Sequence, residues 1–361
     1  METLIGITTG DWFKLLRQNW RNVRLTLLPK IVLFIPITLR NSFYKKKEEK
    51  EYKEKLQDVK ISQSPIFILG HWRSGTTMLH SLMAMDDRFA YPNLFEIYNP
   101  HTFLITEEKL AEKLKNRADS KRPMDNVRVN FNTPGEDEFA LNILSLKSPM
   151  LGWLFPEKEK YYDRYLSFSG VPEEEINQWK GNFLLFVKKL TLKYEKPMLL
   201  KSPPHTARIK LLLELFPDAK FIHLRRNPYR VFQSTLQLYE KTVNSFSMQR
   251  NGGNGLEENI LRRYKLLYDQ FFLQKELIPQ QNFYELHFEK FENDVVGSVK
   301  NIYQHFNLKI HSDFLAKMEQ YVQSNKNYKK NEYPELNTEV KEKVYRFCEN
   351  NFKMWQYPKK V

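Results

Sequence analysis

The stretch that decides the fold runs from residue 66 to residue 77 and is Ile66-Phe67-Ile68-Leu69-Gly70-His71-Trp72-Arg73-Ser74-Gly75-Thr76-Thr77. Its apolar first part predicts a buried strand over Ile66–Gly70, and the residues from Thr76 to Met85 predict a helix. The turn between them holds Gly70 and Gly75, which suits a tight strand-to-helix connection. Backbone N–H groups and the positive end of the helix dipole therefore converge on one point, a candidate anion site.

The spacing from Gly70 to Gly75 is the G-x-x-x-x-G spacing of a nucleotide phosphate loop. An ATP-binding loop of this kind carries Lys directly after the second glycine, where this chain has Thr76. Arg73 supplies a positive charge from within the loop instead. A P-loop nucleotide kinase or NTPase is kept as an alternative function, and it predicts a dependence on Mg²⁺.

Short apolar segments alternate with helical segments after residue 60. The further predicted strands are Met198–Lys201, Lys220–Leu224 and Phe283–Phe288, and the further predicted helices cover His205–Phe216, a segment from Pro228, and Val295–Phe306. This alternation predicts an α/β fold with a three-layer parallel sheet flanked by helices. Ligands of such sheets lie beyond the carboxyl ends of the strands, so residues at those ends are candidate site residues.

Composition bounds the class of protein. The chain has 361 residues, of which 57 are Lys or Arg and 43 are Asp or Glu, so its net charge is +14. A hydrophobic fraction of 41% excludes wholesale disorder and a polytopic membrane protein. The single Cys348 and the lack of a secretory signal predict a cytoplasmic protein. The sequence contains no Cys/His cluster with the spacing of a metal site, so no metal is expected. The excess positive charge admits nucleic acid, an acidic membrane surface or a small polyanion as partner.

Residues 1–60 differ from the rest and are predicted to form an N-terminal helical arm, with 61–361 as the main domain. Apolar residues from Trp12 to Leu27 recur at helical spacing among basic residues, which predicts an amphipathic basic helix. The run Lys45–Lys55 predicts a solvated helix or linker. The longest apolar run, Ile31–Leu39, has nine residues, whereas a bilayer span needs about 20. The arm either packs on the domain or makes peripheral membrane contact.

The residues Arg73-Ser74-Gly75-Thr76-Thr77 after an apolar strand resemble the phosphosulfate-binding loop of certain sulfotransferases. These enzymes use 3′-phosphoadenosine 5′-phosphosulfate (PAPS), and the likeness is strongest to their tyrosylprotein-type and bacterial branches. The resemblance covers about residues 62–310 and implies a P-loop-like sulfotransferase domain over 61–361. It also implies PAPS as co-substrate, adenosine 3′,5′-bisphosphate (PAP) as product, and no required metal. The five loop residues would hold the 5′-phosphate and sulfonate, and Arg73 would stabilise the departing phosphate.

Two further motifs fit this resemblance. The family's 3′-phosphate site has an Arg at a strand end and a Ser eight residues later, which Arg226 and Ser234 match. An Arg beside a helix N-terminus and a hydroxyl in the second turn can together bind one phosphate. The role of the neighbouring Arg225 stays open. Lys201 matches a Lys of the tyrosylprotein-type enzymes and is expected to help neutralise the leaving phosphate.

Sulfo transfer is an in-line displacement at sulfur, and the acceptor hydroxyl needs a general base. Three residues are candidates. Glu96 follows the phosphate-loop helix by about the interval of the catalytic Glu in tyrosylprotein-type enzymes. Glu138 lies in the acidic run Glu136–Glu138, which looks like that of bacterial members, and His205 follows Lys201 by four residues. The choice among them stays open.

Other segments bear on the partners. Cytosolic members of the family carry an Arg-Lys-Gly element near the C-terminus that contacts a phosphate. This sequence lacks the element, and Lys329 and Lys330 are candidate substitutes for that phosphate contact. Aromatic residues gather at Trp153, Phe155, Tyr161, Tyr162, Tyr165 and Phe168. They are consistent with a small-molecule, glycan or lipid hydroxyl as acceptor.

A basic non-enzymatic nucleic-acid or membrane-surface binder is the remaining alternative. Because the basic motif residues lie at strand ends beside phosphate-type loops, a nucleotide is favoured over nucleic acid.

Overall fold

The computed structural model describes residues 2–21, 23–115, 120–121, 128–249, 255–324 and 333–359. The chain divides into two compact units. Unit 1 comprises Met1–Gln63, Tyr91–Met198 and Lys241–Gly252, and unit 2 comprises Ser64–Ala90, Leu199–Glu240 and Gly253–Val361. The chain passes from unit 1 to unit 2 after Gln63, close to the boundary expected near residue 60. The division into an arm of residues 1–60 and one domain of residues 61–361 stays a prediction.

Unit 2 is built on a four-stranded parallel sheet with the order β4-β1-β5-β6. The strands are β1 (Ile66–Leu69), β4 (Leu199–Lys201), β5 (Lys220–Arg225) and β6 (Phe283–His287). Strand β1 pairs with both β4 and β5, and Phe67 lies opposite Leu200 on one side and Phe221 on the other. The turn after β1 is therefore flanked by the segments that follow β4 and β5. All four strands and the parallel α/β sheet were predicted from the sequence, and both are confirmed.

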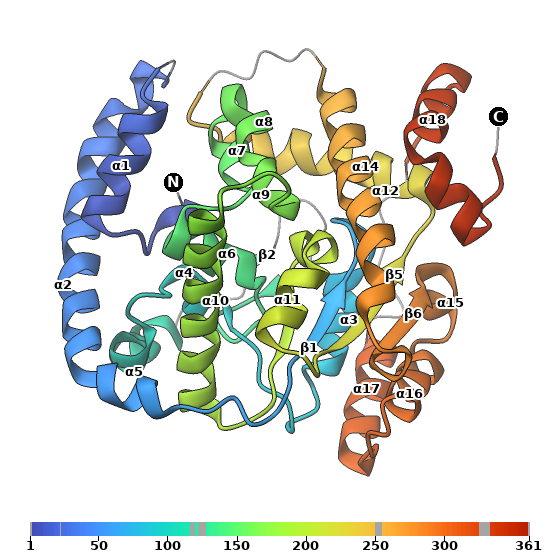
Figure 1. Ribbon diagram of the computed structural model, residues 1–361, viewed down its shortest axis with the longest axis horizontal. Helices are drawn as coiled ribbons and strands as arrows, with labels where there is room; N and C mark the ends of the chain where they lie inside the picture. The colour runs from blue at the N-terminus through green and yellow to red at the C-terminus, as the bar shows by residue number, and fades with distance from the viewer. Residues whose placement is uncertain are drawn as a thin grey trace. The chain divides into compact units, whose positions relative to one another are not determined.

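Helices cover both faces of this sheet (Figure 1). Side chains alternate along β1, so Ile66 and Ile68 share one face and Phe67 lies on the other. Ile68 belongs to a buried core that includes residues of α3 (Thr76–Met83), α16 (Val295–His305) and α17 (Ser312–Ser324). On the opposite face Phe67 stacks on Phe221, and His223 packs on Phe271 of α14 (Leu256–Gln274). The expected three layers are confirmed.

The remaining helices of unit 2 follow the predicted alternation with small shifts. They are the 3₁₀ helix η4 (Pro203–Ala207), α11 (Ile209–Leu215), α12 (Pro228–Leu238), α15 (Phe288–Asn293) and α18 (Thr338–Trp355). The helix expected over His205–Phe216 is split into η4 and α11, because the backbone leaves the helical region at Arg208, with φ −124° and ψ 21°. The helix from Pro228 begins where expected, with the Asn227 side chain accepting a hydrogen bond from the Tyr229 N–H at 2.9 Å.

Unit 1 is largely helical. Its α-helices and strands are α1 (Thr9–Asn19), α2 (Leu28–Asp58), α4 (Leu94–Tyr98), α5 (Phe103–Lys115), α6 (Asp137–Ser145), α7 (Leu151–Leu154), α8 (Glu159–Tyr162), α9 (Arg164–Ser167), α10 (Glu173–Tyr194), α13 (Asn244–Phe246) and the short strands β2 (Ser120–Lys121) and β3 (Arg128–Val129). Helix α1 buries Trp12 and Leu15. It ends at Asn19, earlier than the helical pattern to Leu27 suggested, and α2 then contains both Ile31–Leu39 and Lys45–Lys55.

Helix α2 is also notable for its length. Taken with the turn before it, from Leu25 to Asp58, it is the one helix in the described ranges that is long and apolar enough to cross a membrane. The nine-residue run had been judged too short, and the difference arises because apolar residues before that run extend the window. Only 22% of that window is buried. Core helices of soluble proteins and signal sequences have the same length and composition, so these two properties do not assign α2 to a membrane.

Candidate functional site

The turn between β1 and α3 requires both of its glycines. Gly70 has φ +144° and Gly75 has φ +99°. A Cβ on Gly75 would lie 2.3 Å from the Phe288 ring, and one on Gly70 would lie 2.7 Å from the Leu224 carbonyl oxygen. The Gly70 N–H donates to Thr206 Oγ1 at 2.8 Å. The two glycines therefore allow the turn to approach Phe288 and Leu224 closely. The hydrogen bond to Thr206 anchors the turn to the segment after β4.

The first turn of α3 presents backbone N–H groups. Gly75 is the N-cap and has no side chain to cap the helix, and the Met78 N–H donates to its carbonyl at 3.0 Å. The N–H groups of Thr76 and Thr77 belong to the part of a helix that has no intrahelical acceptors. The Ser74 hydroxyl is used within the turn, because it donates to the His71 carbonyl at 2.8 Å. This geometry is that of an anion site at a helix N-terminus.

Arg73 links the turn to α12. It has φ +70°, a left-handed conformation that is uncommon for a residue with a side chain. Its Nε donates to Ser234 Oγ at 2.8 Å, and Arg226 Nη1 donates to its carbonyl at 2.9 Å. Tyr333 OH donates to the same Ser234 oxygen at 2.8 Å. Three of the predicted site residues, Arg73, Arg226 and Ser234, therefore form one cluster in unit 2.

The two arginines at the end of β5 have different surroundings. Arg225 forms an ion pair with Glu285 of β6, at 3.2 Å between Nε and Oε2, and also contacts His287. Arg226 instead lies over the Phe288 ring, 4.1 Å from its centroid. Burial lowers the pKa of Arg226, while nearby Glu292 opposes that shift. The arginine with the predicted spacing to Ser234 is thus the one that contacts the turn, and Arg225 is engaged within the sheet.

Lys201 lies at the end of β4 and His205 follows it, but their side chains contact different parts of unit 2. Lys201 is the last residue of the strand, is 2% exposed, and has Nζ 3.5 Å from Thr77 Oγ1. It therefore lies at the first turn of α3 with the phosphate-loop residues. His205 lies in η4, is fully buried, and packs edge-on against Phe67 with 5.5 Å between ring centroids. Its ring thus contacts the core beside the central strand.

Tyr333 was missed by the sequence analysis. Its segment is held against α12, because Gln233 Nε2 donates to the Pro334 carbonyl at 2.5 Å. Lys329 and Lys330, the candidate substitutes for the Arg-Lys-Gly element, lie outside the described residues. The only local signal was a Tyr-Pro pair shortly after two lysines, and its long-range contact with Ser234 has no counterpart in the sequence pattern.

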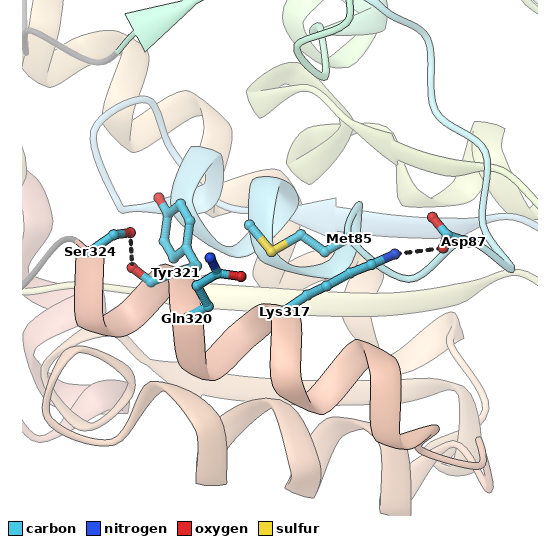
Figure 2. A pocket seen from close by; sticks show the side chains of 6 residues that line it. All are labelled: Met85, Asp87, Lys317, Gln320, Tyr321 and Ser324. Carbon is cyan, nitrogen blue, oxygen red and sulfur yellow. Dashed lines mark hydrogen bonds and ion pairs between the residues drawn. The ribbon is translucent and has the colours of Figure 1, made fainter.

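A shallow pocket of about 350 Å³ also lies in unit 2 (Figure 2). It is lined by Met85, Asp87, Lys317, Gln320, Tyr321 and Ser324. Helix α3 begins at the phosphate loop, and Met85 and Asp87 follow its other end, so no predicted site residue lines this pocket. Within the parts of the chain that the structure describes, no group of three or more His, Cys, Asp or Glu side chains is placed to hold a metal ion.

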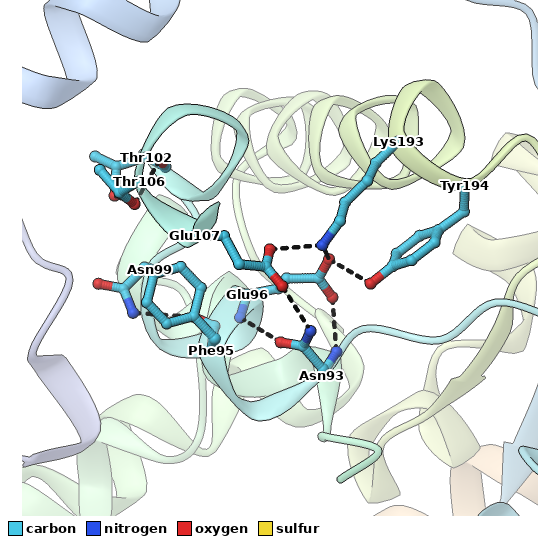
Figure 3. A network of polar contacts seen from close by, with 9 residues as sticks. All are labelled: Asn93, Phe95, Glu96, Asn99, Thr102, Thr106, Glu107, Lys193 and Tyr194. Carbon is cyan, nitrogen blue, oxygen red and sulfur yellow. Dashed lines mark hydrogen bonds and ion pairs between the residues drawn. The ribbon is translucent and has the colours of Figure 1, made fainter. Parts of the chain in front are cut away.

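Glu96 lies in unit 1, where it belongs to a fully engaged polar network (Figure 3). Its Oε2 accepts from the Asn93 N–H at 2.7 Å in a capping box at the start of α4. Its Oε1 accepts from Lys193 Nζ and Tyr194 OH, each at 2.8 Å. Burial raises the pKa of Glu96, although Lys193 acts in the opposite direction. The Oε2 atom therefore caps α4, and the Oε1 atom links α4 to α10.

Glu138 lies in the first turn of α6, also in unit 1, and is fully buried. Asn142 follows it by one helical turn, on the same face of the helix. The Asn142 side chain is fully buried, and neither its amide nitrogen nor its oxygen has a hydrogen-bond partner among the described residues. Most buried polar groups are hydrogen-bonded, so this amide is an exception that needs an explanation. Asn142 was not singled out from the sequence, where only its spacing from Glu138 pointed to it.

The aromatic residues expected to form an acceptor surface are mostly interior to unit 1. Phe155, Tyr162, Tyr165 and Phe168 are buried, whereas Tyr161 is 48% exposed. The Phe168 ring lies 5.1 Å from that of Trp179 in α10, between ring centroids. This cluster therefore contributes to the packing of unit 1.

Comparisons with known proteins agree with this geometry. A model of the sulfotransferase family matches residues 65–313. The omega-hydroxy-beta-dihydromenaquinone-9 sulfotransferases Stf3 of Mycobacterium bovis and Mycobacterium tuberculosis are each 34% identical over 329 residues, which cover 91% of this chain and 84% of the relative.

Solved structures share the fold. Sulfotransferase STF9 from Mycobacterium avium has a TM-score of 0.70 at 17% identity and covers 96% of each chain. Sulfotransferase STF1 from Mycobacterium tuberculosis has a TM-score of 0.66 at 18% identity and covers 93% of this chain and 91% of its own. The family match spans all four strands of the sheet and includes Arg73, Arg226 and Ser234 of the cluster described above. Together with the 34% identical relatives, it shows that this chain belongs to the sulfotransferase family.

Proposed function

We propose that this sulfotransferase takes the sulfo group from PAPS and transfers it to a hydroxyl of a lipid-like acceptor, releasing PAP. The observation that carries the proposal is the cluster around the start of α3, where Arg73 contacts Ser234 and Arg226. The α3 N-terminus with Lys201 and Thr77 suits a 5′-phosphosulfate, and Arg226 with Ser234 suits a 3′-phosphate. Two separate anion positions in one unit favour a nucleotide that carries both groups.

These residues also suit the chemistry of the transfer. In an in-line displacement, the acceptor oxygen bonds to sulfur while the bond from sulfur to the 5′-phosphate oxygen breaks, and that oxygen gains negative charge. Lys201 Nζ, which lies by Thr77 in the first turn of α3, is the cation proposed to neutralise that charge. Arg73 adds a second positive charge, and the N–H groups of the turn bind the sulfonate oxygens. The proton of the acceptor hydroxyl goes to the general base.

We assign the base to Glu138. Both Glu96 oxygens are taken by Asn93, Lys193 and Tyr194, and the His205 ring packs on Phe67. Glu138 instead has beside it the amide of Asn142, which has no partner within the described ranges. An amide of this kind can hydrogen-bond to a hydroxyl and orient it toward a carboxylate.

The relatives support the proposed class of acceptor. The Stf3 enzymes are named for omega-hydroxy-beta-dihydromenaquinone-9, and we carry over only its chemical class, a hydroxyl on a lipid-like molecule. Small polar alcohols and glycans are the alternative acceptors. The reaction is proposed to run in the cytoplasm, with peripheral membrane contact through the N-terminal helices and no role for nucleic acid.

A thermal-shift comparison of PAP with ATP, each with and without Mg²⁺, tests the donor. At about 100 times its Kd, PAP should stabilise the protein by roughly 2.7 kcal/mol without metal. Ser234→Ala serves as the matched control, because it removes a hydroxyl of the proposed 3′-phosphate position and should reduce the PAP shift. A larger shift with ATP and Mg²⁺ than with PAP would overturn the proposal and favour a kinase or NTPase.

A further inference from the structure

Helix α2 has two apolar faces, of which only one is covered. The inner face is buried within unit 1 and carries Ile31, Phe34, Thr38 and Asn41. The opposite face, which we call the outer stripe, consists of Leu28, Val32, Leu33, Leu39 and Phe43, with exposed fractions of 49%, 61%, 73%, 55% and 65%. Leu28, Val32, Leu39 and Phe43 follow the helical repeat and share one face, and Leu33 extends this face around the helix. An exposed apolar stripe of this length is unusual on a soluble surface and marks an interaction site.

The same part of the chain is strongly basic. Between Asp11 and Glu48 there is no acidic residue, and there are nine basic ones: Lys14, Arg17, Arg21, Arg24, Lys30, Arg40, Lys45, Lys46 and Lys47. Arg40, Lys46 and Lys47 are exposed on α2. Helix α1, which lies beside α2 (Figure 1), contributes the exposed Phe13, and Trp20 follows it with 67% exposure. Apolar and cationic side chains are thus exposed together.

We propose that this surface, the outer stripe with Phe13, Trp20 and the seven of these cations that are exposed (all but Arg24 and Lys45), binds the anionic face of a lipid bilayer. Exposed apolar side chains flanked by Lys and Arg are what an interfacial helix needs, because the apolar groups enter the acyl boundary while the cations meet acidic headgroups. The inference rests on the proposed peripheral membrane contact and names its residues and its lipid chemistry. It does not depend on which nucleotide is the sulfo donor.

Charge complementarity selects this partner over two others. A second copy of the chain on this face would bring seven exposed cations against seven more, with no acidic residue between Asp11 and Glu48 to offset them. Nucleic acid would satisfy the cations but leave the leucines and valine of the outer stripe without an apolar partner. An anionic bilayer satisfies both.

The inner face indicates that α2 lies on the bilayer and does not cross it. Asn41 Nδ2 donates to the carbonyls of Ile5 and Ile7 at 2.7 and 3.0 Å, and the Thr9 N–H donates to Ser42 Oγ at 2.9 Å. Glu48 forms a buried ion pair with Lys189 of α10. A helix that spanned the bilayer would have to give up these contacts and place the polar groups in hydrocarbon.

Vesicle flotation of the full chain tests the proposal. The vesicles are phosphatidylcholine alone, or phosphatidylcholine with about 30% phosphatidylglycerol, and the salt is about 0.1 M or about 0.5 M NaCl. Binding to the anionic vesicles should exceed binding to the neutral ones by about tenfold or more at low salt, and should fall at high salt. Equal binding to both vesicles, or no binding, overturns the proposal.

Matched variants localise the contact. Leu33→Gln with Phe43→Gln should abolish flotation, whereas Leu273→Gln, which changes a leucine of α14 that is 71% exposed, should leave it intact. Arg40→Gln with Lys47→Gln should remove only the extra binding to anionic vesicles. Loss of a dimer in the first variant, seen by light scattering, would assign the stripe to a second copy and refute the proposal. If neither high salt nor alkaline carbonate extracts the protein from cell membranes, α2 spans the bilayer, and the proposal is refuted as well. The thermal shift with PAP is measured for each variant as well, so that a loss of membrane binding can be told apart from a failure of the proposed PAP site.

Discussion

Arg73 connects both halves of the proposed nucleotide site, because its side chain holds Ser234 and its carbonyl is held by Arg226. Arg73→Ala removes the charge and the contact with Ser234 but leaves the backbone contact in place. Turnover should fall by about 10²-fold or more, since a cation beside a developing negative charge is lost. Single-turnover formation of PAP measures this, and circular dichroism checks the fold. Arg73→Lys keeps the charge without the Nε contact, so its activity should lie in between; an Arg73→Ala enzyme with normal turnover would remove Arg73 from the mechanism.

Glu138 is predicted to act on the acceptor and not on the donor. Glu138→Gln should lower turnover by about 10²–10⁴-fold, the usual contribution of a general base, while the affinity for PAP stays the same. Glu96→Gln is the comparison, because Glu96 holds Asn93, Lys193 and Tyr194 and its loss should lower the melting temperature. Full activity in Glu138→Gln, or equal inactivation of both stable variants, would contradict the assignment.

Tyr333 has a narrower predicted effect. Its hydroxyl donates to Ser234 Oγ, so Tyr333→Phe removes one hydrogen bond from the proposed 3′-phosphate position. The Kd for PAP should rise by about 2- to 10-fold, which matches the net value of one hydrogen bond. Adenosine 5′-phosphate, which has no 3′-phosphate, should bind both forms equally well. Isothermal titration with the two nucleotides measures the difference. An equal loss for both nucleotides would mean that Tyr333 acts on the fold and not on the 3′-phosphate position.

At the scale of an element, one prediction concerns the turn between β1 and α3. Gly75 has φ +99°, and a Cβ there would lie 2.3 Å from the Phe288 ring. Gly75→Ala should therefore lower the free energy of unfolding by about 2–4 kcal/mol, through backbone strain and overpacking. Gly181→Ala in α10 is the control, because a Cβ there has nothing within 4 Å and should stabilise the helix by about 0.5–1 kcal/mol. Urea unfolding measures both. A neutral Gly75→Ala would show that the turn can relax.

The elements differ in how far the sequence predicted them. Strands β1, β4 and β5 could be located because short apolar runs end at glycine, lysine or arginine, and the motif spacings put Arg226 and Ser234 eight residues apart. The contacts that complete the cluster could not be predicted in the same way. Tyr333 contacts Ser234 across 99 residues of chain, and a pattern within a short window carries no information about such a pair. Asn142 is similar, because its unpartnered amide is visible only once burial is known.

For the N-terminal helices, the sequence pattern predicted the helical segment but not which of its faces would be exposed. Periodicity identified a basic amphipathic segment, but a window centred on Ile31–Leu39 gave no reason for two apolar faces on α2. The reason is tertiary, since unit 1 covers only the side that carries Ile31 and Phe34. Local pattern therefore established that the segment is helical, and packing determined which face stays exposed.

At the scale of the whole molecule, buried histidines make the protein sensitive to acid. Burial lowers the pKa of His71 to about 4, and burial also lowers the pKa values of His101 and His223. In the unfolded chain these groups titrate near pH 6.5. As the pH falls below that value, the unfolded chain therefore binds protons before the folded protein does. The stability that they contribute is complete above about pH 6.5 and is lost as the pH falls toward 4.

The resulting pH profile can be measured by urea unfolding between pH 8 and pH 4.5. By pH 4.5, His71 alone should account for a loss of about 2–3 kcal/mol, because the unfolded form is then protonated while the folded form is still largely neutral. His71→Gln removes one titrating group, so its stability should fall less steeply over this range than that of the unchanged protein. Its stability at pH 8 will be lower, because the contact of Nδ1 with the Trp72 carbonyl at 2.8 Å is altered, and the slope, not the absolute value, is therefore the quantity to compare. A stability that stays flat or rises as the pH falls from 6.5 would show that the buried histidines are protonated in the folded protein.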